Sequence, residues 1–267
     1  MTNVHEHNRK SWNMQSTSGE CRWAEPVDST TIAAAELGDW SVVLTPTLTV
    51  PDAWFGDLKG KDVLCLASGG GQQVPVLAAA GAKVTSFDAS DEQLAKDRLV
   101  AERDDLAITC IRGDMADLNE FDNASFDLIF HPVANVFAAN VRIVWQECFR
   151  VLRNDGRLLS GFMNPDFFLF DHDEIESGGP MTVRYGLPYS DLESLAPEQL
   201  ETRLKDNAAL EFSHSLDDQI GGQIDVGFVI AGFYEDRWDD AATPLNRYMP
   251  TSIATLAIKP AISDASR

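Results

Sequence analysis

The chain has 267 residues, of which 44% are hydrophobic and 24% charged, a balance typical of a globular protein with a substantial core. Its 42 acidic and 21 basic residues give a formal net charge of −21. Such a surface repels phosphate backbones, so nucleic acid is an unfavourable partner. No stretch approaches the ~20 apolar residues of a membrane helix, and the polar N-terminus lacks the apolar block of a secretion signal. We therefore expect a cytoplasmic protein that does not enter a membrane.

The first 60 residues follow no regular pattern. One short helix is expected near residues 6–16, followed by an irregular arm with two X-Pro breaks in "TPTLTVP". We expect this arm to pack on the core through its tryptophans, which are Trp12, Trp23, Trp40 and Trp54.

From residue 61 onward, short apolar runs alternate with helical patterns. Several of the runs are apolar without alternation, as in a parallel sheet that helices cover on both faces. The repeated strand-helix-strand order predicts a doubly wound parallel sheet with right-handed crossovers. The expected strands of this part are residues 62–67, 82–88, 106–114, 126–132 and 156–164.

Two of the expected helices carry clear signals. Ser90 opens one of them, with acidic residues in its first turn and Gln93 at the spacing of a capping box. The stretch "VRIVWQECFRVL" (141–152) has a single apolar stripe. We expect "RNDG" to end that helix, with Gly156 in the turn.

The segment after the fifth strand is too long and too aromatic for a plain connection. It leaves the carboxyl end of a strand, where open α/β sheets bind ligands, so we interpret it as a cap. A helical stretch weakened by Gly221 and Gly222 and two strands, 228–236 and 252–260, would complete a seven-stranded mixed sheet. The expected parts are an arm (1–60), a core (61–163), a cap insertion (164–215) and a C-terminal part of helix and edge strands (216–267).

The run "VLCLASGGGQQ" (63–73) delivers a glycine loop at the tip of the first core strand. Such a loop usually lets a nucleotide-like ligand approach the backbone. The dinucleotide fingerprint fails, because the sixth position counted from Gly69 is Val74. No Gly-Lys-Ser/Thr follows either. The loop is therefore not built for phosphates.

The order of motifs resembles the class I S-adenosylmethionine-dependent methyltransferases, close to their small-molecule branch. The family's D/E-x-G-x-G-x-G loop is similar to "CLASGGG", with Ala67, Gly69 and Gly71 at its small positions. Its acidic residues after the second and third strands are matched by Asp88 and Asp114, and "FDLIFHP" and "ECFRVLRNDGRLL" match as well. The resemblance covers roughly residues 60–163. A narrower group of uncharacterised bacterial methyltransferases shares "LASGGGQQ" and "SGFMNP".

The resemblance implies the Rossmann-like methyltransferase fold and S-adenosyl-L-methionine as cofactor, with S-adenosyl-L-homocysteine as product. Asp88 would accept the ribose hydroxyl protons, each charge-assisted bond contributing roughly 1.5–3 kcal/mol. Asp114 would accept the adenine amino proton beside Met115. The expected cofactor contacts are Ala67, Ser68, Gly69, Gly71, Gln72, Asp88, Ala89, Gln93, Asp114, Met115 and His131.

Two departures from the family pattern stand out, and two of the expected contacts have plainer readings. Cys65 occupies the place of the loop's acidic residue, so Gln72, Gln73 or the arm would have to supply the function of that acid. Ala67 replaces the first glycine, which predicts a tighter loop. Asp88 could instead be a carboxylate at a helix N-terminus. Gln93 could be only the capping partner of the serine before it.

His131 ends the fourth strand, where this fold presents side chains towards the methyl group and the acceptor. Its unperturbed pKa near ~6.5 suits proton abstraction from a hydroxyl or amine. Alternatively, it only hydrogen-bonds the cofactor or the backbone. Four further residues are candidates for the acceptor pocket, namely Asn135, Asn164, Phe167 and Tyr185.

The sequence therefore predicts a methyltransferase that acts on a small molecule by in-line transfer. The aromatic and acidic cap permits an apolar or a cationic acceptor without requiring either. A non-catalytic module that binds S-adenosylmethionine and an NAD(P)-dependent oxidoreductase stay as alternatives. No metal is expected, because the cysteines are scattered and Asp171-His172-Asp173-Glu174 is more simply a solvated acidic loop. The oligomeric state is open.

Overall fold

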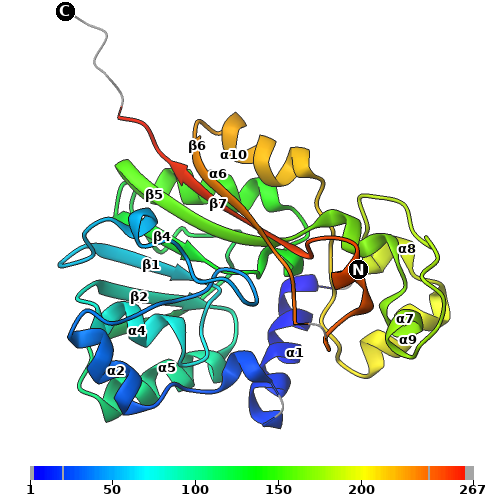
Figure 1. Ribbon diagram of the computed structural model, residues 1–267, viewed down its shortest axis with the longest axis horizontal. Helices are drawn as coiled ribbons and strands as arrows, with labels where there is room; N and C mark the ends of the chain where they lie inside the picture. Colours follow the sequence, from blue (N-terminus) through cyan, green and yellow to red (C-terminus); the bar gives the residue numbers. More distant parts are fainter. Residues whose placement is uncertain (1–2, 20, 240, 262–267) are drawn as a thin grey trace, which may run out of the picture.

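The computed structural model describes residues 3–19, 21–239 and 241–261, and within them one mixed sheet of seven strands runs through the molecule (Figure 1). The strands are β1 (Asp62–Leu66), β2 (Lys83–Asp88), β3 (Ile108–Arg112), β4 (Phe126–His131), β5 (Leu152–Met163), β6 (Val229–Asp236) and β7 (Ser252–Ile258). The helices are α1 (Val4–Ser18), η1 (Arg22–Ala24), α2 (Ser29–Glu36), α3 (Asp52–Phe55), α4 (Gln73–Ala79), α5 (Asp91–Arg103), η2 (Asn135–Phe137), α6 (Val141–Val151), η3 (Pro165–Leu169), α7 (His172–Glu176), α8 (Asp191–Ser194), α9 (Pro197–Lys205), η4 (Asp217–Gly221), α10 (Gly222–Asp225) and η5 (Pro244–Arg247).

The strand order is β3-β2-β1-β4-β5-β7-β6. The first five strands are parallel, and β7 is antiparallel to both β5 and β6. The predicted doubly wound sheet with two edge strands is therefore confirmed.

Helices cover both faces of the sheet, because alternate residues of a strand point to opposite sides. On one face, Val63 and Cys65 of β1 belong to a core cluster with residues of α2 and α4. On the other face, Leu64 and Leu66 pack in a second cluster with the apolar stripe of α6. The unalternated apolar run that predicted a parallel strand is thus buried on both sides.

Helix α6 ends at Val151, and β5 begins at Leu152, ahead of the turn residues "RNDG". Leu152 is fully buried and already has extended backbone, with φ −75° and ψ 141°, and it pairs with Phe126 of β4. The register then shifts before the pairing resumes between Leu128 and Arg157. The strand thus begins four residues earlier than expected, and the turn residues form an irregularity within it, where Asp155 has φ +59°.

The two glycines at 221 and 222 lie inside helical backbone, and packing explains the second of them. A Cβ atom at Gly222 would lie 2.9 Å from Cδ1 of Trp145, which is completely buried in α6. Arg142 of the same helix forms ion pairs with Asp217 and Asp225. The C-terminal helical stretch is thereby held against α6.

The N-terminal segment contains more helix than expected. Helix α1 begins at Val4, capped by the side chain of Asn3, and packs on α5. Helix α2 was missed, although Asp28 caps it and its buried Ile32 lies in the core cluster that contains α4. The tryptophans do make packing contacts, with ring centroids 5.2 Å apart for Trp12–Phe137, 6.5 Å for Trp23–Trp238 and 5.0 Å for Trp40–Phe55.

Residues 164–215 follow the carboxyl end of β5 and carry α7, α8 and α9, which form a separate group beside the sheet (Figure 1). None of the helices in the described residues is both long and apolar enough to traverse a bilayer. Our division of the chain into four parts stays a prediction.

Candidate functional site

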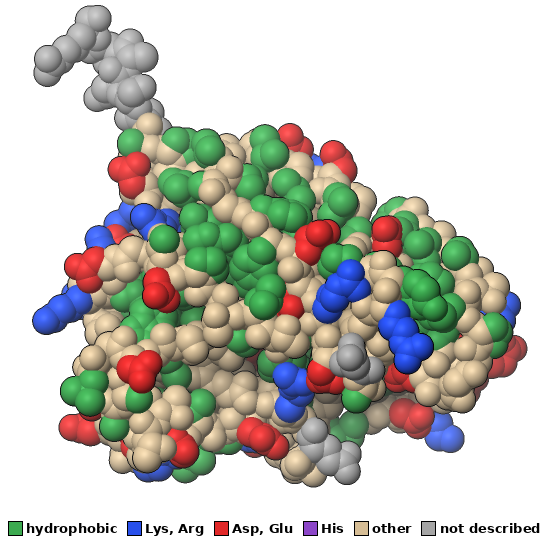
Figure 2. Space-filling view, viewed as in Figure 1, with side chains coloured by type: hydrophobic (Ala, Val, Ile, Leu, Met, Phe, Trp, Pro, Cys, Tyr) green, Lys and Arg blue, Asp and Glu red, His purple; other side chains and the backbone are tan. Residues whose placement is uncertain are grey.

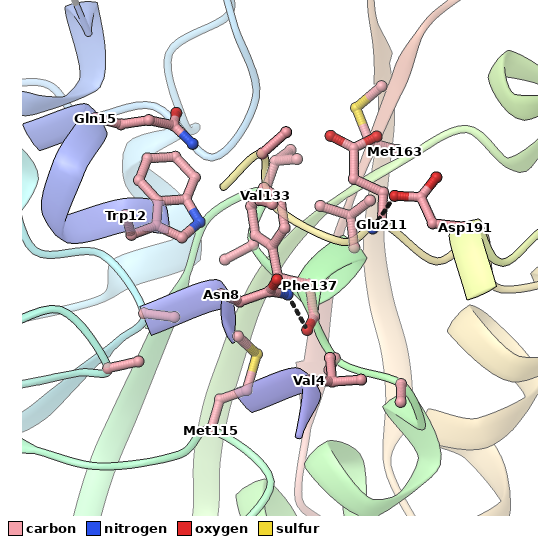
Figure 3. A pocket seen from close by; sticks show the side chains of 18 of the residues that line it. Val4, Asn8, Trp12, Gln15, Met115, Val133, Phe137, Met163, Asp191 and Glu211 are labelled. Atoms are coloured by element: carbon pink, nitrogen blue, oxygen red, sulfur yellow. Dashed lines mark hydrogen bonds between the residues drawn. The ribbon is translucent and has the colours of Figure 1, made fainter. Parts of the chain in front are cut away.

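A cavity of about 1310 Å³ lies where the parallel strands end. The segments that follow β1, β2, β3 and β4 form one side of it, α1 forms another, and the 164–215 segment closes the far end (Figure 3). This is the place where open α/β sheets bind ligands.

The glycine loop enters the cavity with strained backbone. Ala67 has φ +50°, a left-handed conformation that costs a residue other than glycine roughly 1–2 kcal/mol. Gly69 allows a close approach, because a Cβ atom there would lie 2.9 Å from Cβ of Gln93 and 3.2 Å from Oδ2 of Asp88. Ala67, Ser68 and Gly69 all line the cavity.

Asp88, at the end of β2, holds two pieces of backbone together. Its Oδ2 accepts a hydrogen bond from the N–H of Gly69 at 3.1 Å, and its Oδ1 accepts one from the N–H of Ser90, the N-cap of α5, at 2.8 Å. Burial raises the pKa of Asp88 to about 6, although these backbone hydrogen bonds lower it. The residue therefore does organise a helix N-terminus, and it also lines the cavity together with Ala89.

Asp97, on α5, supports the loop from behind and was not singled out in the sequence. Its Oδ1 accepts from the N–H of Gly71 at 2.7 Å and its Oδ2 from the hydroxyl of Ser86 at 2.7 Å. Burial raises its pKa to about 7, and the charge of Asp88 adds to the rise. The signal was available, because Gln93, Asp97 and Val100 share one buried stripe at helical spacing.

The second half of the loop faces the N-terminal arm. The carbonyl of Gly71 accepts a hydrogen bond from the N–H of Val27 at 2.8 Å. A Cβ atom on Gly71, which has φ +78°, would lie 3.0 Å from Cβ of Pro26. Gly71 is not among the residues that line the cavity, so its expected cofactor contact has no support in this geometry.

Both glutamines of the loop bind the backbone of the first 60 residues. Gln72 donates from Nε2 to the carbonyls of Arg22, at 2.6 Å, and Glu25, at 2.9 Å. Oε1 of Gln73 accepts from the N–H of Val43 at 3.0 Å. The amides therefore clamp the arm onto the loop, and Gln72 also lines the cavity.

Four residues that line the cavity, Thr45, Ser68, Gln93 and His172, each have a buried side-chain polar atom without a hydrogen-bond partner among the described residues, and two of these atoms belong to the glycine loop and the helix beside it. They are Oγ of Ser68 and Oε1 of Gln93. The backbone N–H of Gln93 donates to Oγ of Ser90 at 3.1 Å, as the capping box predicts. The side-chain oxygen of Gln93, however, does not make the reciprocal hydrogen bond to the N-cap residue. Buried polar atoms normally have partners, so these two are suited to a polar ligand.

Asp114 and Met115 line the end of the cavity that α1 covers. Oδ2 of Asp114 lies 3.2 Å from Nδ1 of His5, and its Oδ1 accepts from the N–H of Ala116 at 2.9 Å. Figure 3 shows Met115 beside the first turns of α1, below Asn8.

Helix α1 also joins the two ends of the cavity through Asn8, a contribution that the sequence did not reveal. The Asn8 side chain donates to the carbonyl of Phe137 at 3.2 Å (Figure 3). It also donates to the carbonyl of Leu210 at 2.9 Å and accepts from the N–H of Leu210 at 2.8 Å. It is 5% exposed. Trp12, one helical turn later, lines the cavity as well.

His131 does not reach the cavity. It has no exposed surface and is not among the residues that line the cavity. Its Nδ1 donates to the carbonyl of Leu66 at 2.9 Å, while Nε2 is buried without a partner. Burial lowers the pKa of His131 to about 4, so the ring is neutral near pH 7. The structure therefore gives no support to proton abstraction by His131 or to its contact with the cofactor.

The four acceptor-pocket candidates divide into two pairs. Asn135 exchanges side-chain hydrogen bonds with Gln219, and Asn164 donates to the carbonyl of residue 250, so neither lines the cavity. Phe167 and Tyr185 do line it.

Cys65, which replaces the family's acidic loop residue, is completely buried and lies outside the cavity wall. Burial raises the pKa of its thiol, so it supplies no charge. Asp97 provides a carboxylate to the same loop, but from behind it.

The comparisons with known proteins agree with this geometry. The family model for a methyltransferase domain matches residues 64–160. The uncharacterized methyltransferase YbaJ of Bacillus subtilis (strain 168) is 49% identical over 253 residues, which are 95% of this chain and 97% of that protein.

Solved structures resemble the chain at lower identity. An S-adenosylmethionine dependent methyltransferase from Mesorhizobium loti has a TM-score of 0.58 at 20% identity, over 77% of this chain and 94% of that one. Geranyl diphosphate C-methyltransferase from Streptomyces coelicolor A3(2), in complex with Mg²⁺, geranyl diphosphate and S-adenosyl-L-homocysteine, has a TM-score of 0.60 at 14% identity, over 97% of this chain and 99% of that one. At these identities the likeness shows the fold.

The sheet and the glycine-loop cavity together define a class I S-adenosylmethionine-dependent methyltransferase. Because it is 49% identical to YbaJ along nearly its whole length, this chain belongs to that family. The resemblance drawn from the motifs is confirmed, and S-adenosylmethionine is the cofactor.

Packing of the arm on the loop can be measured by comparing Gly71→Ala with Gly60→Ala. The two glycines have similar φ values, +78° and +74°, but a Cβ atom at Gly60 meets nothing within 4 Å. Both variants bear the backbone strain, and only Gly71→Ala also crowds the arm, so it should lose at least about 1 kcal/mol more stability in urea unfolding. Equal losses would contradict the packing contact.

Titration of Asp97 predicts a pH-dependent effect of Asp97→Asn. The carboxyl's pKa rises from 3.8 to about 7 on folding, so between these values the unfolded chain releases a proton that the folded chain keeps. Wild-type stability is lowered as pH rises from about 4 to about 7, and the asparagine variant escapes this loss. Its stability relative to wild type should therefore rise across that window in urea titrations. Ser86→Ala, which keeps the Asp97 carboxyl, should lose stability over the same pH range as the wild type. A stability difference between Asp97→Asn and wild type that does not change with pH would rule out the raised pKa.

Proposed function

We propose that this protein transfers a methyl group from S-adenosylmethionine to a small-molecule acceptor enclosed by the 164–215 segment, which acts as a cap. The observation that carries the proposal is a single cavity that joins the glycine loop and Asp88 to residues of that segment. Its volume of about 1310 Å³ exceeds the ~300–1,000 Å³ of a site for one drug-sized ligand, which leaves room for a cofactor and an acceptor together.

The residues at the loop end suit a cofactor without phosphates. Gly69 leaves the backbone bare, Asp88 provides a carboxylate for the ribose, and Asp114 lies where the adenine is expected. Among the described residues that line the cavity, Arg203 is the one lysine or arginine, and it lies in the 164–215 segment. A pyrophosphate would therefore meet carboxylates and no cation at the loop.

When bound, S-adenosylmethionine supplies a sulfonium methyl group, which a lone pair of the acceptor attacks in line while the electron pair of the broken C–S bond stays on sulfur. The protein's part is to align the two reactants and to keep water out. Asn8 ties α1 to η2 and to the backbone of Leu210, so the cofactor end and the cap end share one wall. Aromatic rings of the cap supply apolar surface there.

A small acceptor fits a cavity that the 164–215 segment partly covers better than a polymer does. Figure 2 shows the basic side chains scattered over one face of the molecule, among acidic and hydrophobic ones, without a continuous basic band. With a net charge of −21, this surface is poorly suited to nucleic acid. A cytoplasmic location stays a prediction, as does the absence of a nucleic-acid partner.

Methyl transfer is tested by adding the protein and labelled S-adenosylmethionine to a cell extract in which the endogenous methyltransferases have been inactivated by heat. We expect label in the small-molecule fraction and S-adenosylhomocysteine as the second product. Label in the protein or nucleic-acid fraction would overturn the small-molecule acceptor. Binding of the cofactor without any transfer would favour a non-catalytic module.

Asp88→Ala should weaken binding of S-adenosylhomocysteine at least tenfold by calorimetry, because a charge-assisted hydrogen bond contributes roughly 1.5–3 kcal/mol. Glu92→Gln, an exposed change in the next helix, should leave affinity unchanged. In thermal shift, S-adenosylhomocysteine should raise the wild-type melting temperature by mass action, whereas NAD should not. An unchanged dissociation constant in Asp88→Ala would remove this residue from the site.

A further inference from the structure

We infer that the acceptor carries a positively charged nitrogen, which the Glu211 carboxylate receives at the cap end of the cavity. The inference rests on the proposed function, whose acceptor it specifies. Glu211 lines the cavity, and Figure 3 shows its side chain beside Met163 and Asp191.

Glu211 has a fixed backbone. Its N–H donates to Oδ2 of Asp191 at 2.8 Å, and its carbonyl accepts from the N–H of Asp191 at 3.1 Å. On either side of it, Leu210 and Phe212 are buried, and Leu210 is also bound by Asn8. A side chain on such a support is preorganised, which reduces the entropy lost when a ligand binds.

The neighbouring carboxylate, Asp191, is bound mainly within the protein and is almost inaccessible. Its Oδ1 accepts from the hydroxyl of Tyr189 at 2.6 Å, and its Oδ2 accepts from Arg203 at 3.1 Å as well as from the backbone. Asp191 is 1% exposed. The single cation at this end of the cavity is thus already neutralised by an ion pair.

The Glu211 carboxylate itself accepts no hydrogen bond from the described residues; only its backbone groups are paired. Burial raises its pKa to about 7, Arg203 lowers it, and the charges of Asp191 and Asp173 raise it further. Arg203 and Asp191 pair with each other, and Asp173 adds a further negative charge, so this end of the cavity has a net negative charge that Glu211 increases when it is ionised.

His172 offers a second acceptor in the same cavity. Its Nε2 donates to the carbonyl of Phe167 at 2.9 Å, so the proton lies on that nitrogen, and Nδ1 presents a lone pair. Nδ1 is buried without a partner among the described residues, and burial lowers the pKa of the ring, which stays neutral. A carboxylate and an imidazole lone pair both require a donor, and an ammonium group is one.

Aromatic rings surround this end and favour the same charge. Tyr185 and Tyr189 pack edge to face at 5.0 Å, and Phe168 stacks on Tyr189 at 5.5 Å. All three line the cavity. Aromatic faces attract cations and also bury the apolar part of a ligand, whereas an anionic acceptor would find no free cation here.

The inference is tested with three probes of one skeleton, namely phenethylamine, 2-phenylethanol and phenylacetate, titrated calorimetrically at pH 8 in saturating S-adenosylhomocysteine. We expect the amine to bind at least tenfold more tightly than the alcohol, and phenylacetate to bind more weakly than either. Equal affinities, a preference for phenylacetate, or no binding of any probe at millimolar concentration would overturn the inference. If S-adenosylhomocysteine itself does not bind, the proposed function fails instead.

Glu211→Gln should abolish the preference for the amine and leave the affinity for the alcohol unchanged. Glu201→Gln, an exposed change in the same segment, should preserve the preference. The Glu211 side chain makes no hydrogen bond, so its variant should melt within a few degrees of wild type. Should it fail to fold, the wild-type probe series alone decides. An unchanged amine preference in a folded Glu211→Gln protein would refute the assignment.

The pH dependence of amine binding gives an independent test of the role of Glu211. The charged groups that act on the pKa of Glu211 are Arg203 of α9, Asp191 of α8 and Asp173 of α7, and the neutral His172 lines the same cavity. As pH falls from 8 to 6, Glu211 takes up a proton while phenethylamine keeps its charge. Amine affinity should fall by up to about tenfold, and the affinity for 2-phenylethanol should not change. A pH-independent amine affinity would contradict a role for this carboxylate.

Discussion

Two buried carboxylates hold the glycine loop by its backbone, and the site depends on them. Asp88 binds the N–H of Gly69 from the end of β2, and Asp97 binds the N–H of Gly71 from α5. Both are costly to ionise in this environment, and burial raises both pKa values. Their hydrogen bonds fix a segment whose glycines would otherwise be free. The loop is thus rigid at the place where a ligand must meet bare backbone.

The N-terminal segment completes this site instead of merely covering it. The arm is clamped to the outer side of the loop by Gln72 and Gln73. Helix α1 forms a wall of the cavity, and the side chain of Asn8 bonds it both to η2 and to the backbone of Leu210, the residue before Glu211. One side chain of this wall thus joins the two ends of the cavity. This arrangement suits a reaction in which alignment supplies much of the rate.

Much of the fold followed from local pattern. The parallel strands are apolar on both faces, and the stripe of α6 repeats at helical spacing, so both could be predicted without tertiary information. Helix α2 was missed because its short apolar pattern is stabilised mainly by packing near α4, and the start of β5 because burial of Leu152 outweighs the turn residues after it. Of the expected cofactor contacts, those from Ala67 to Gly69 and those around Asp88 and Asp114 line the cavity, whereas Gly71 and His131 lie behind its wall.

The order of strands, the bare loop and the two acidic residues after β2 and β3 can be read from the chain itself, because each depends on neighbours within a few residues. These features sufficed for the family and its cofactor. The helical spacing of α5 already indicated that Asp97 lies on its buried stripe, whereas the role of Asn8 and the proposed role of Glu211 could not be read in this way. Each acts through partners far along the chain, Asn8 on Leu210 for example, and their burial exists only once α1, the sheet and the 164–215 segment have packed together. A charged or polar residue in a helix or loop looks solvated until the fold removes the water around it.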